Sequence, residues 1–143
     1  MKHPFDVPAH LSPDLTRVRA YWRGLLRGEA KMPFWDDAKL SDLPDLTGRL
    51  FLIDVFQGPE RFRFGEVGGG IGGDEMEGRF LDETALAHPF EFLRAQCSVT
   101  IECAAPTCFH MDEARGRGAY SRLLLPMWGD GRISMVLGVV DAE

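Results

Sequence analysis

The chain has 143 residues, of which 45% are hydrophobic and 27% charged, a length and composition typical of one ordinary soluble domain. Twenty-two acidic residues against sixteen basic ones give a net charge of −6, which argues against a broad nucleic-acid-binding face because such a face has to be basic. No apolar run reaches the roughly 20 residues that cross a bilayer, and the N-terminus lacks the apolar core of a signal peptide, so we expect a cytoplasmic protein.

The first elements are an arm and a helix. Residues 1–11 predict a flexible N-terminal arm, and residues 12–28 an amphipathic helix. Ser12 is a good N-cap, and the proline that follows it suits the first helical position. An apolar stripe then recurs at helical spacing, formed by Leu15, Val18, Trp22, Leu25 and Leu26. Such a helix can pack on its own domain or on a second copy of the chain.

A connector and a hairpin come next. Residues 29–48 contain two prolines and several aspartates, which favour a connector over a regular element. Residues 50–56 are rich in strand formers, and residues 61–67 alternate charged and aromatic side chains. A short turn joins the two strands into an antiparallel hairpin, in which Phe62 and Phe64 face the interior.

The second half of the chain predicts one more helix and three more strands. Residues 68–90 are glycine-rich and form short helical turns at most. Residues 91–103 predict a helix with a buried stripe made of Phe92, Leu93, Cys97 and Ile101. Strands follow at 106–111, 119–127 and 132–141. This order predicts an α+β fold with helices on one face of an antiparallel sheet, plus the N-terminal amphipathic helix.

Several segments of this pattern occur together in one family. They are residues 48–55, 61–68, 77–83, 122–127 and the pair Leu137-Gly138. In their order and spacing they resemble a short, stand-alone bacterial family of the PAS-domain superfamily, over about residues 15–143. The resemblance implies a five-stranded antiparallel sheet in a domain of residues 49–143, with a cavity between its inner face and the flanking helices.

The resemblance also implies a role. PAS-like domains sense small molecules, bind cofactors, or mediate dimerisation and partner docking, so we expect a sensor of signal transduction that acts through ligand-modulated dimerisation or docking. It implies no reaction, and we expect no enzyme. The sequence identifies no cofactor. A homodimer that forms through the N-terminal helix, a protein partner and a small-molecule ligand are the expected partners, with no nucleic acid and no membrane.

Seven residues are the predicted ligand-binding set on the inner sheet face: Phe62, Phe64, Glu66, Tyr120, Arg122, Met135 and Leu137. Arg122 beside Tyr120 can hold an anion by paired hydrogen bonds, or it can point outward into a surface salt bridge. Glu66 faces the interior if the alternation of Phe62 and Phe64 continues, although the family usually has a bulky apolar residue there. If the strand ends earlier, Glu66 reaches water.

Two other readings of the chain remain open. The large interior side chains can fill the core completely, which would make the chain a ligand-free interaction adaptor. A small cone-shaped α+β isomerase or hydratase would instead need an acid–base group such as Glu66 or Asp54.

Further motifs carry little chemistry. Residues 68–73 match the pattern GxGxxG, but they follow a hairpin strand and precede no long helix, so we expect a flexible loop rather than a nucleotide site. His88 is a formal haem-ligand candidate, but a lone histidine is more often a loop residue. Cys97, Cys103 and Cys108 are expected to be buried free thiols. We find no catalytic constellation and no metal-binding motif.

Overall fold

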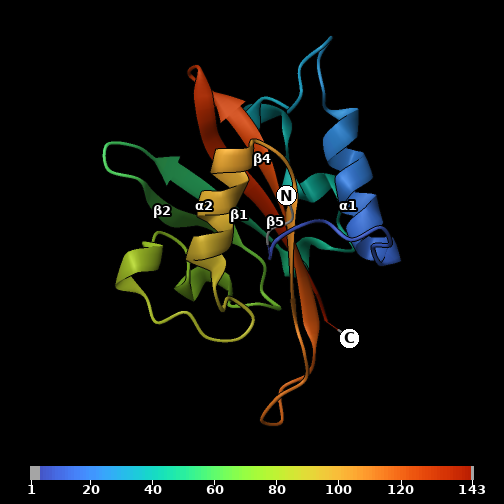
Figure 1. Ribbon diagram of the computed structural model, residues 1–143, viewed down its shortest axis with the longest axis vertical. Coiled ribbons are helices and arrows are strands. Elements are labelled where there is room, and N and C mark those ends of the chain that lie inside the picture. The colour runs from blue at the N-terminus through green and yellow to red at the C-terminus, as the bar shows by residue number, and fades with distance from the viewer. Residues whose placement is uncertain (1–3, 143) are drawn as a thin grey trace.

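A five-stranded antiparallel sheet forms the centre of the molecule, which the computed structural model describes for residues 4–142 (Figure 1). Its strands are β1 (Leu50–Phe56), β2 (Arg61–Val67), β3 (Thr107–Met111), β4 (Tyr120–Gly129) and β5 (Arg132–Ala142). They lie in the order β2-β1-β5-β4-β3, and each neighbouring pair is antiparallel. The expected α+β class and the five-stranded antiparallel sheet are therefore confirmed.

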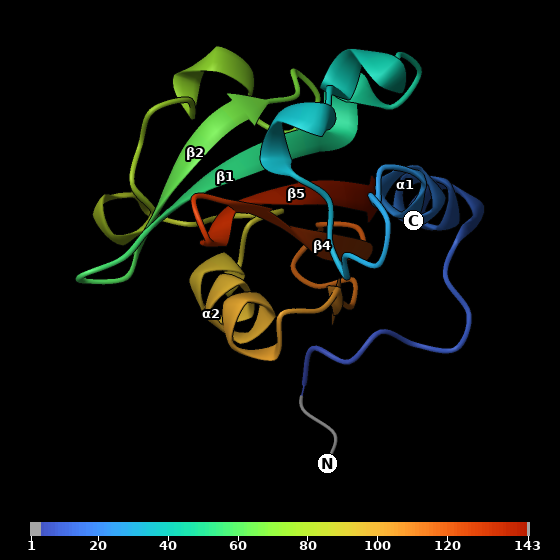
Figure 2. The ribbon, with the colours of Figure 1, turned by 90° about the horizontal axis from the view of Figure 1, so that it is seen from above.

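Each face of the sheet carries its own apolar core. Helix α2 (Leu93–Cys103) covers one face, and helix α1 (Pro13–Gly24) packs against the other (Figure 2). Strand β5 shows the division, because Val136 and Val140 belong to the α2-side core while Leu137 and Val139 belong to the α1-side core. The sheet is thus covered from both sides, as alternation of side chains along a strand requires.

Helix α1 forms where the sequence predicts it, although it ends at Gly24 rather than at residue 28. The Ser12 side chain accepts a hydrogen bond from the backbone N–H of Leu15, which caps the helix as expected. The stripe residues Leu15, Val18 and Trp22 are buried against the protein's own sheet. The Trp22 indole donates a 2.9 Å hydrogen bond to the carbonyl of Pro126 in β4. This apolar stripe is therefore already covered within one chain.

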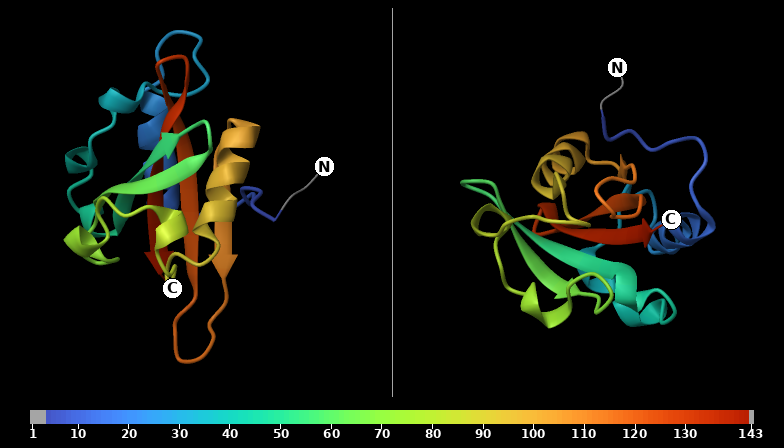
Figure 3. Two further views of the ribbon diagram at one scale, coloured as in Figure 1. Left: turned by 90° about the vertical axis from the view of Figure 1, so that its left-hand side faces the viewer. Right: turned by 90° about the horizontal axis from the view of Figure 1, so that it is seen from below.

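The connector between α1 and β1 makes three short 3-10 turns, η1 (Trp35–Asp37), η2 (Leu40–Asp42) and η3 (Thr47–Arg49). Two more, η4 (Gly73–Glu75) and η5 (Leu81–Glu83), follow β2. The first connector turn packs against β4 at the end of the β4–β5 hairpin, and the connector then runs past β1 and β2 on the α1 side (Figure 3).

A β-bulge in β2 decides between the two positions left open for Glu66: the side chain reaches water, although the strand continues to Val67 rather than ending earlier. Opposite β1, Ile53 pairs with Phe64 but Phe51 pairs with Val67, so β2 holds one extra residue between these two pairs. The extra residue reverses the alternation. Val67 takes the inward place that the sequence pattern assigns to Glu66, and Glu66 is exposed on the opposite side.

One other expectation from the sequence is wrong. Phe92 is not part of a buried helical stripe, because it precedes α2 with a φ of 60° and is 63% exposed. The expected loose arm of residues 1–11 lies only partly in the described chain, and within it Phe5 is buried. The Phe5 carbonyl accepts a hydrogen bond from the backbone N–H of Cys108, which holds the arm against the outer edge of β3.

Candidate functional site

Four of the seven predicted ligand-binding residues do meet on the α2 side of the sheet. Phe62, Phe64, Tyr120 and Arg122 are all buried there. Phe90, from the loop before α2, is buried in the same core. The ring of Phe90 lies edge-on to Phe64 and Phe51, with centroids 5.1 Å and 5.5 Å away. Aromatic side chains of the chain itself thus pack against one another in this part of the core.

A glycine makes this packing possible. Gly138 of β5 lies directly under the ring of Phe51, and any side chain at that position would collide with the ring. The aromatic packing in this core thus depends on Gly138, which leaves room for the Phe51 ring, and on the Phe90 ring from the loop before α2.

Arg122 is held by the chain itself rather than by a salt bridge. Its guanidinium has no exposed surface and donates hydrogen bonds of 2.8–2.9 Å to the side chain of Gln96 and to the carbonyls of Pro89 and Glu91. Burial lowers the pKa of Arg122 from its usual value, because removing the guanidinium from water disfavours its charge. The alternative of an outward arginine in a surface salt bridge is therefore wrong, whereas anion binding by Arg122 stays a prediction.

Gln96 extends this contact into a buried polar network. Its side-chain amide donates to the hydroxyl of Thr107 and to the carbonyl of Arg122. The hydroxyl of Thr100 lies 2.6 Å from that of Thr107 and donates to the carbonyl of Gln96. Buried polar groups need such partners, and these four residues supply them to one another. The network ties α2 to β3 and β4.

Tyr120, Glu91 and His88 form the rim of the same region. The Tyr120 hydroxyl donates a 2.6 Å hydrogen bond to the Glu91 carboxylate, and the His88 ring lies edge-on to the Tyr120 ring. Burial raises the pKa of Tyr120, and the bond to the carboxylate raises it further. Burial alone would raise the pKa of Glu91, but the hydrogen bond from Tyr120 and the nearby positive charges outweigh it and hold that pKa below its usual value.

The other three predicted residues lie elsewhere. Met135 and Leu137 belong to the α1 side of β5, so their assignment to the same face as Phe62 and Phe64 is wrong. The reason is strand alternation, since the inward residues of β5 on the α2 side are the even-numbered Val136 and Val140. Leu137 is buried in the α1-side core. Met135 and Glu66, by contrast, both border an open groove.

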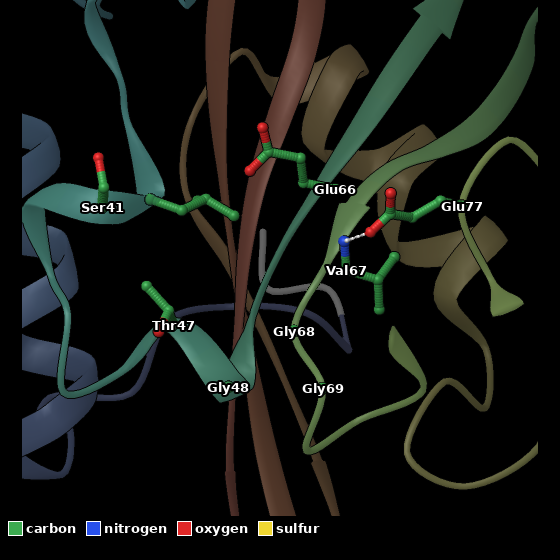
Figure 4. A pocket seen from close by; sticks show the side chains of 9 residues that line it. Ser41, Thr47, Gly48, Glu66, Val67, Gly68, Gly69 and Glu77 are labelled. Carbon is green, nitrogen blue, oxygen red and sulfur yellow. Dashed lines mark hydrogen bonds between the residues drawn. The ribbon is translucent and has the colours of Figure 1, made fainter. Parts of the chain in front are cut away.

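That groove lies between the connector and strands β1, β2 and β5. Its larger part has a volume of about 560 Å3 and is lined by Trp35, Asp36, Ala38, Lys39, Leu40, Ser41, Leu52, Gly65, Glu66 and Met135. An adjoining part of about 460 Å3 shares Leu40, Ser41 and Glu66 and continues along Thr47, Gly48, Val67, Gly68, Gly69 and Glu77. Figure 4 shows the carboxylate of Glu66 directed from β2 toward the connector that carries Ser41, whereas that of Glu77 accepts a hydrogen bond from the backbone N–H of Val67.

The glycine-rich run next to this groove has a structural explanation. The N–H groups of Gly68 and Gly70 donate to the carbonyls of Leu50 and Gly48 at 2.8 and 2.9 Å. A side chain at Gly68 would collide with the backbone of residues 47–48, so glycine is needed for this close approach. Only the three-residue turn η4 follows the run. The run therefore joins two backbone segments and has no helix N-terminus to offer a phosphate.

The remaining candidate groups are accounted for within the described chain. The Asp54 carboxylate pairs with Arg63 across the β1–β2 hairpin at 3.0 Å. Cys97 and Cys108 are buried as expected, but Cys103 is exposed, which contradicts the expectation for that residue. Burial raises the pKa of Cys97 to about 12. Among residues 4–142, no three His, Cys, Asp or Glu side chains are grouped to hold a metal ion, and no helix is long and apolar enough to cross a membrane.

Two residues that shape the interior were missed by sequence reasoning. Gln96 carries a detectable signal, because it lies one helical turn before Thr100 and next to the buried Cys97, so a polar pair shares the buried side of α2. A mid-strand arginine in β4 is the partner that such a pair needs. Phe90 carries no signal, since a loop has no periodicity that could predict its insertion into the core.

Comparison with known proteins adds no relative. No protein-family model matches the chain, and neither a curated protein nor a solved structure does.

Proposed function

We propose that the chain is a PAS-like module of signal transduction, not an enzyme, that acts by docking to a second copy of itself or to a partner protein. The proposal draws support from the five-stranded antiparallel sheet, one face of which is covered by α2 together with the segment that follows β2. That is the arrangement which the sequence resemblance implies.

The insertion of Phe90 is the observation that favours docking over an interior ligand. Its ring occupies the space between Phe51 and Phe64, where a cavity sensor of this fold would hold a small molecule. Arg122, which the sequence offers as an anion anchor, directs its hydrogen bonds to oxygens of the chain itself. Because Phe90 packs inside and Arg122 is paired within the chain, binding would use the outer surface.

Self-association would use the outward face of α1, because the apolar stripe of this helix is buried on the sheet. The outward face borders a shallow groove of about 380 Å3, which is lined by Ala9, Leu11, Thr16, Arg19, Ala20 and Arg23. Ala20 is exposed and small, so a second helix can approach the backbone closely at this point.

Sedimentation equilibrium of the full chain, combined with native mass spectrometry, tests the proposal. We expect a monomer–dimer equilibrium between micromolar and millimolar protein, with no bound small molecule. The Ala20→Glu substitution should raise the dimer Kd at least about tenfold, because it places a charge in the interface. The matched substitution Ala95→Glu, on the exposed face of α2, should leave the Kd unchanged.

Three results would contradict the proposal. A chain that stays monomeric at every concentration rules out self-docking, and equal effects of the two substitutions rule out the outward face of α1. A stoichiometric small molecule that is released only on unfolding contradicts the filled interior.

A further inference from the structure

The groove between the connector and the sheet holds an ionisable group without a partner. Among residues 4–142, the Glu66 carboxylate makes no salt bridge and accepts no hydrogen bond. The bulge in β2 places this carboxylate on the open side of the sheet, and Figure 4 shows it directed across the groove. A bulge that re-aims one side chain is a feature often found next to binding sites.

The charges around Glu66 favour a cation. Asp36 also lines the larger part of the groove, and Glu77 lines the adjoining part. Lys39 is the one basic residue among the side chains that line either part, and in the described chain no carboxylate oxygen lies within 4 Å of its ammonium group. Three acidic groups against one basic group leave the groove with a negative balance, in a chain whose net charge is −6.

An aromatic side chain and two apolar ones line the same groove as Glu66. Trp35 lines the groove and is 37% exposed. Its indole is held against Gly129, where any side chain would collide with it, and the neighbouring Phe34 packs edge-on to Trp128. Leu52 and Met135 supply apolar surface from β1 and β5 to the same groove. The aromatic ring is thus positioned by the fold and still accessible.

We propose that this groove binds an organic ammonium ion carried on a flat apolar body. The ammonium pairs with Glu66, and the apolar body lies between Trp35, Leu52 and Met135. A carboxylate combined with an aromatic face is the chemistry that recognises such cations. This site deepens the proposed function by naming the class of ligand that the module binds. What binding does to the module rests on the proposed function, whereas the binding itself does not.

Two-dimensional 1H–15N NMR of the full chain tests the site, with tryptamine as the probe. We expect saturable shifts of the Trp35 indole N–H and of the Gly65 and Glu66 amides. The buried indole N–H of Trp22, which is bonded to Pro126, serves as an internal reference that does not move. Indole-3-ethanol has the same ring without the charge and should bind at least about fivefold more weakly. Indole-3-acetate, an anion, should cause no saturable shift.

A pair of matched variants isolates the carboxylate. Glu66→Gln should weaken tryptamine binding at least about fivefold, because it removes the charge and keeps the shape. Glu102→Gln, at an exposed position on α2, should not change the affinity. No saturable shift at Gly65 and Glu66, or equal affinities of the two variants, would overturn the site. The NMR shifts report ligand binding, and sedimentation reports dimerisation. If tryptamine does not bind, the dimerisation result still stands, and if the chain does not dimerise, the binding result still stands.

Discussion

Replacing Arg122 by methionine is expected to destabilise the protein strongly, because this side chain supports the structure from within. The substitution removes three hydrogen bonds and keeps a long apolar side chain in the same space. The Gln96 oxygen is then buried without a donor, whereas the carbonyls of Pro89 and Glu91 are partly buried and can take water.

The expected magnitude follows from these three acceptors. A buried acceptor without a partner costs about 1–3 kcal/mol, and each partly exposed carbonyl about 0.5–1 kcal/mol, so the free energy of unfolding should fall by about 2–5 kcal/mol. One effect reduces this loss. A positive charge is costly in the interior, as the lowered pKa of Arg122 indicates, and the methionine removes that charge. A domain is usually stable by only about 5–15 kcal/mol, so the effect is large.

Urea unfolding followed by tryptophan fluorescence measures the change, and a double-mutant cycle gives its origin. Gln96→Leu should cost at least about 1 kcal/mol less in the Arg122→Met background than in the wild type, because the two residues share one hydrogen bond. Arg94→Met, at an exposed position on α2, is the control and should change stability by less than about 0.5 kcal/mol.

The reasoning is refuted if Arg122→Met leaves the stability within about 0.5 kcal/mol of wild type, or if the two substitutions are additive. Either result would mean that Arg122 is free to act on a ligand rather than on the loop that carries Phe90.

Three further predictions concern the rim, the thiols and the glycine run. The hydrogen bond from Tyr120 lowers the pKa of Glu91 in the folded state. This bond therefore stabilises the protein at any pH above the pKa of Glu91 in the unfolded chain, and the stabilisation is lost as the pH falls through the pKa of Glu91 in the folded state. Tyr120→Phe should lower the free energy of unfolding by about 1 kcal/mol at pH 7 and by progressively less at acid pH, as measured by urea unfolding. N-ethylmaleimide should add once to the native chain, at Cys103, and three times in urea, as mass spectrometry would show; rapid double labelling would contradict the burial of the other two thiols. Gly68→Ala should destabilise by about 1–3 kcal/mol because it collides with the preceding backbone, whereas Gly69→Ala, which meets nothing within 4 Å, should be neutral in the same assay.

The sequence predicts the elements of this fold better than it predicts the faces of its strands. Periodicity finds α1 with its stripe of Leu15, Val18 and Trp22, and it finds all five strands within one or two residues of their ends. These signals are local, because each depends on residues a few positions apart in the chain.

The side of the sheet to which a strand residue points is harder to predict, because one extra residue in the strand reverses it. Glu66 lies outside because of the bulge opposite Phe51 and Ile53, and a bulge of one residue leaves the composition of the strand unchanged. Met135 was assigned to the wrong face because β5 is apolar on both sides, so its pattern does not show which side meets α2.

The candidate site depended on contacts that span the chain. Arg122 meets the loop carbonyls of Pro89 and Glu91 more than thirty residues away, and the groove at Glu66 exists only because connector residues 35–41 fold back beside β1, β2 and β5. No local pattern encodes either contact, so the residues could be singled out from the sequence while their surroundings could not.

The filled interior is the central claim, and benzene binding tests it most directly. Apolar cavities of about 150 Å3 bind benzene, so methyl NMR signals of Leu93 and Val136 would report an open interior. We predict no saturable benzene shift in the wild type and a clear one in Phe90→Ala, which removes the inserted ring. Saturable binding of benzene beside Leu93 and Val136 in the wild-type protein would contradict the account.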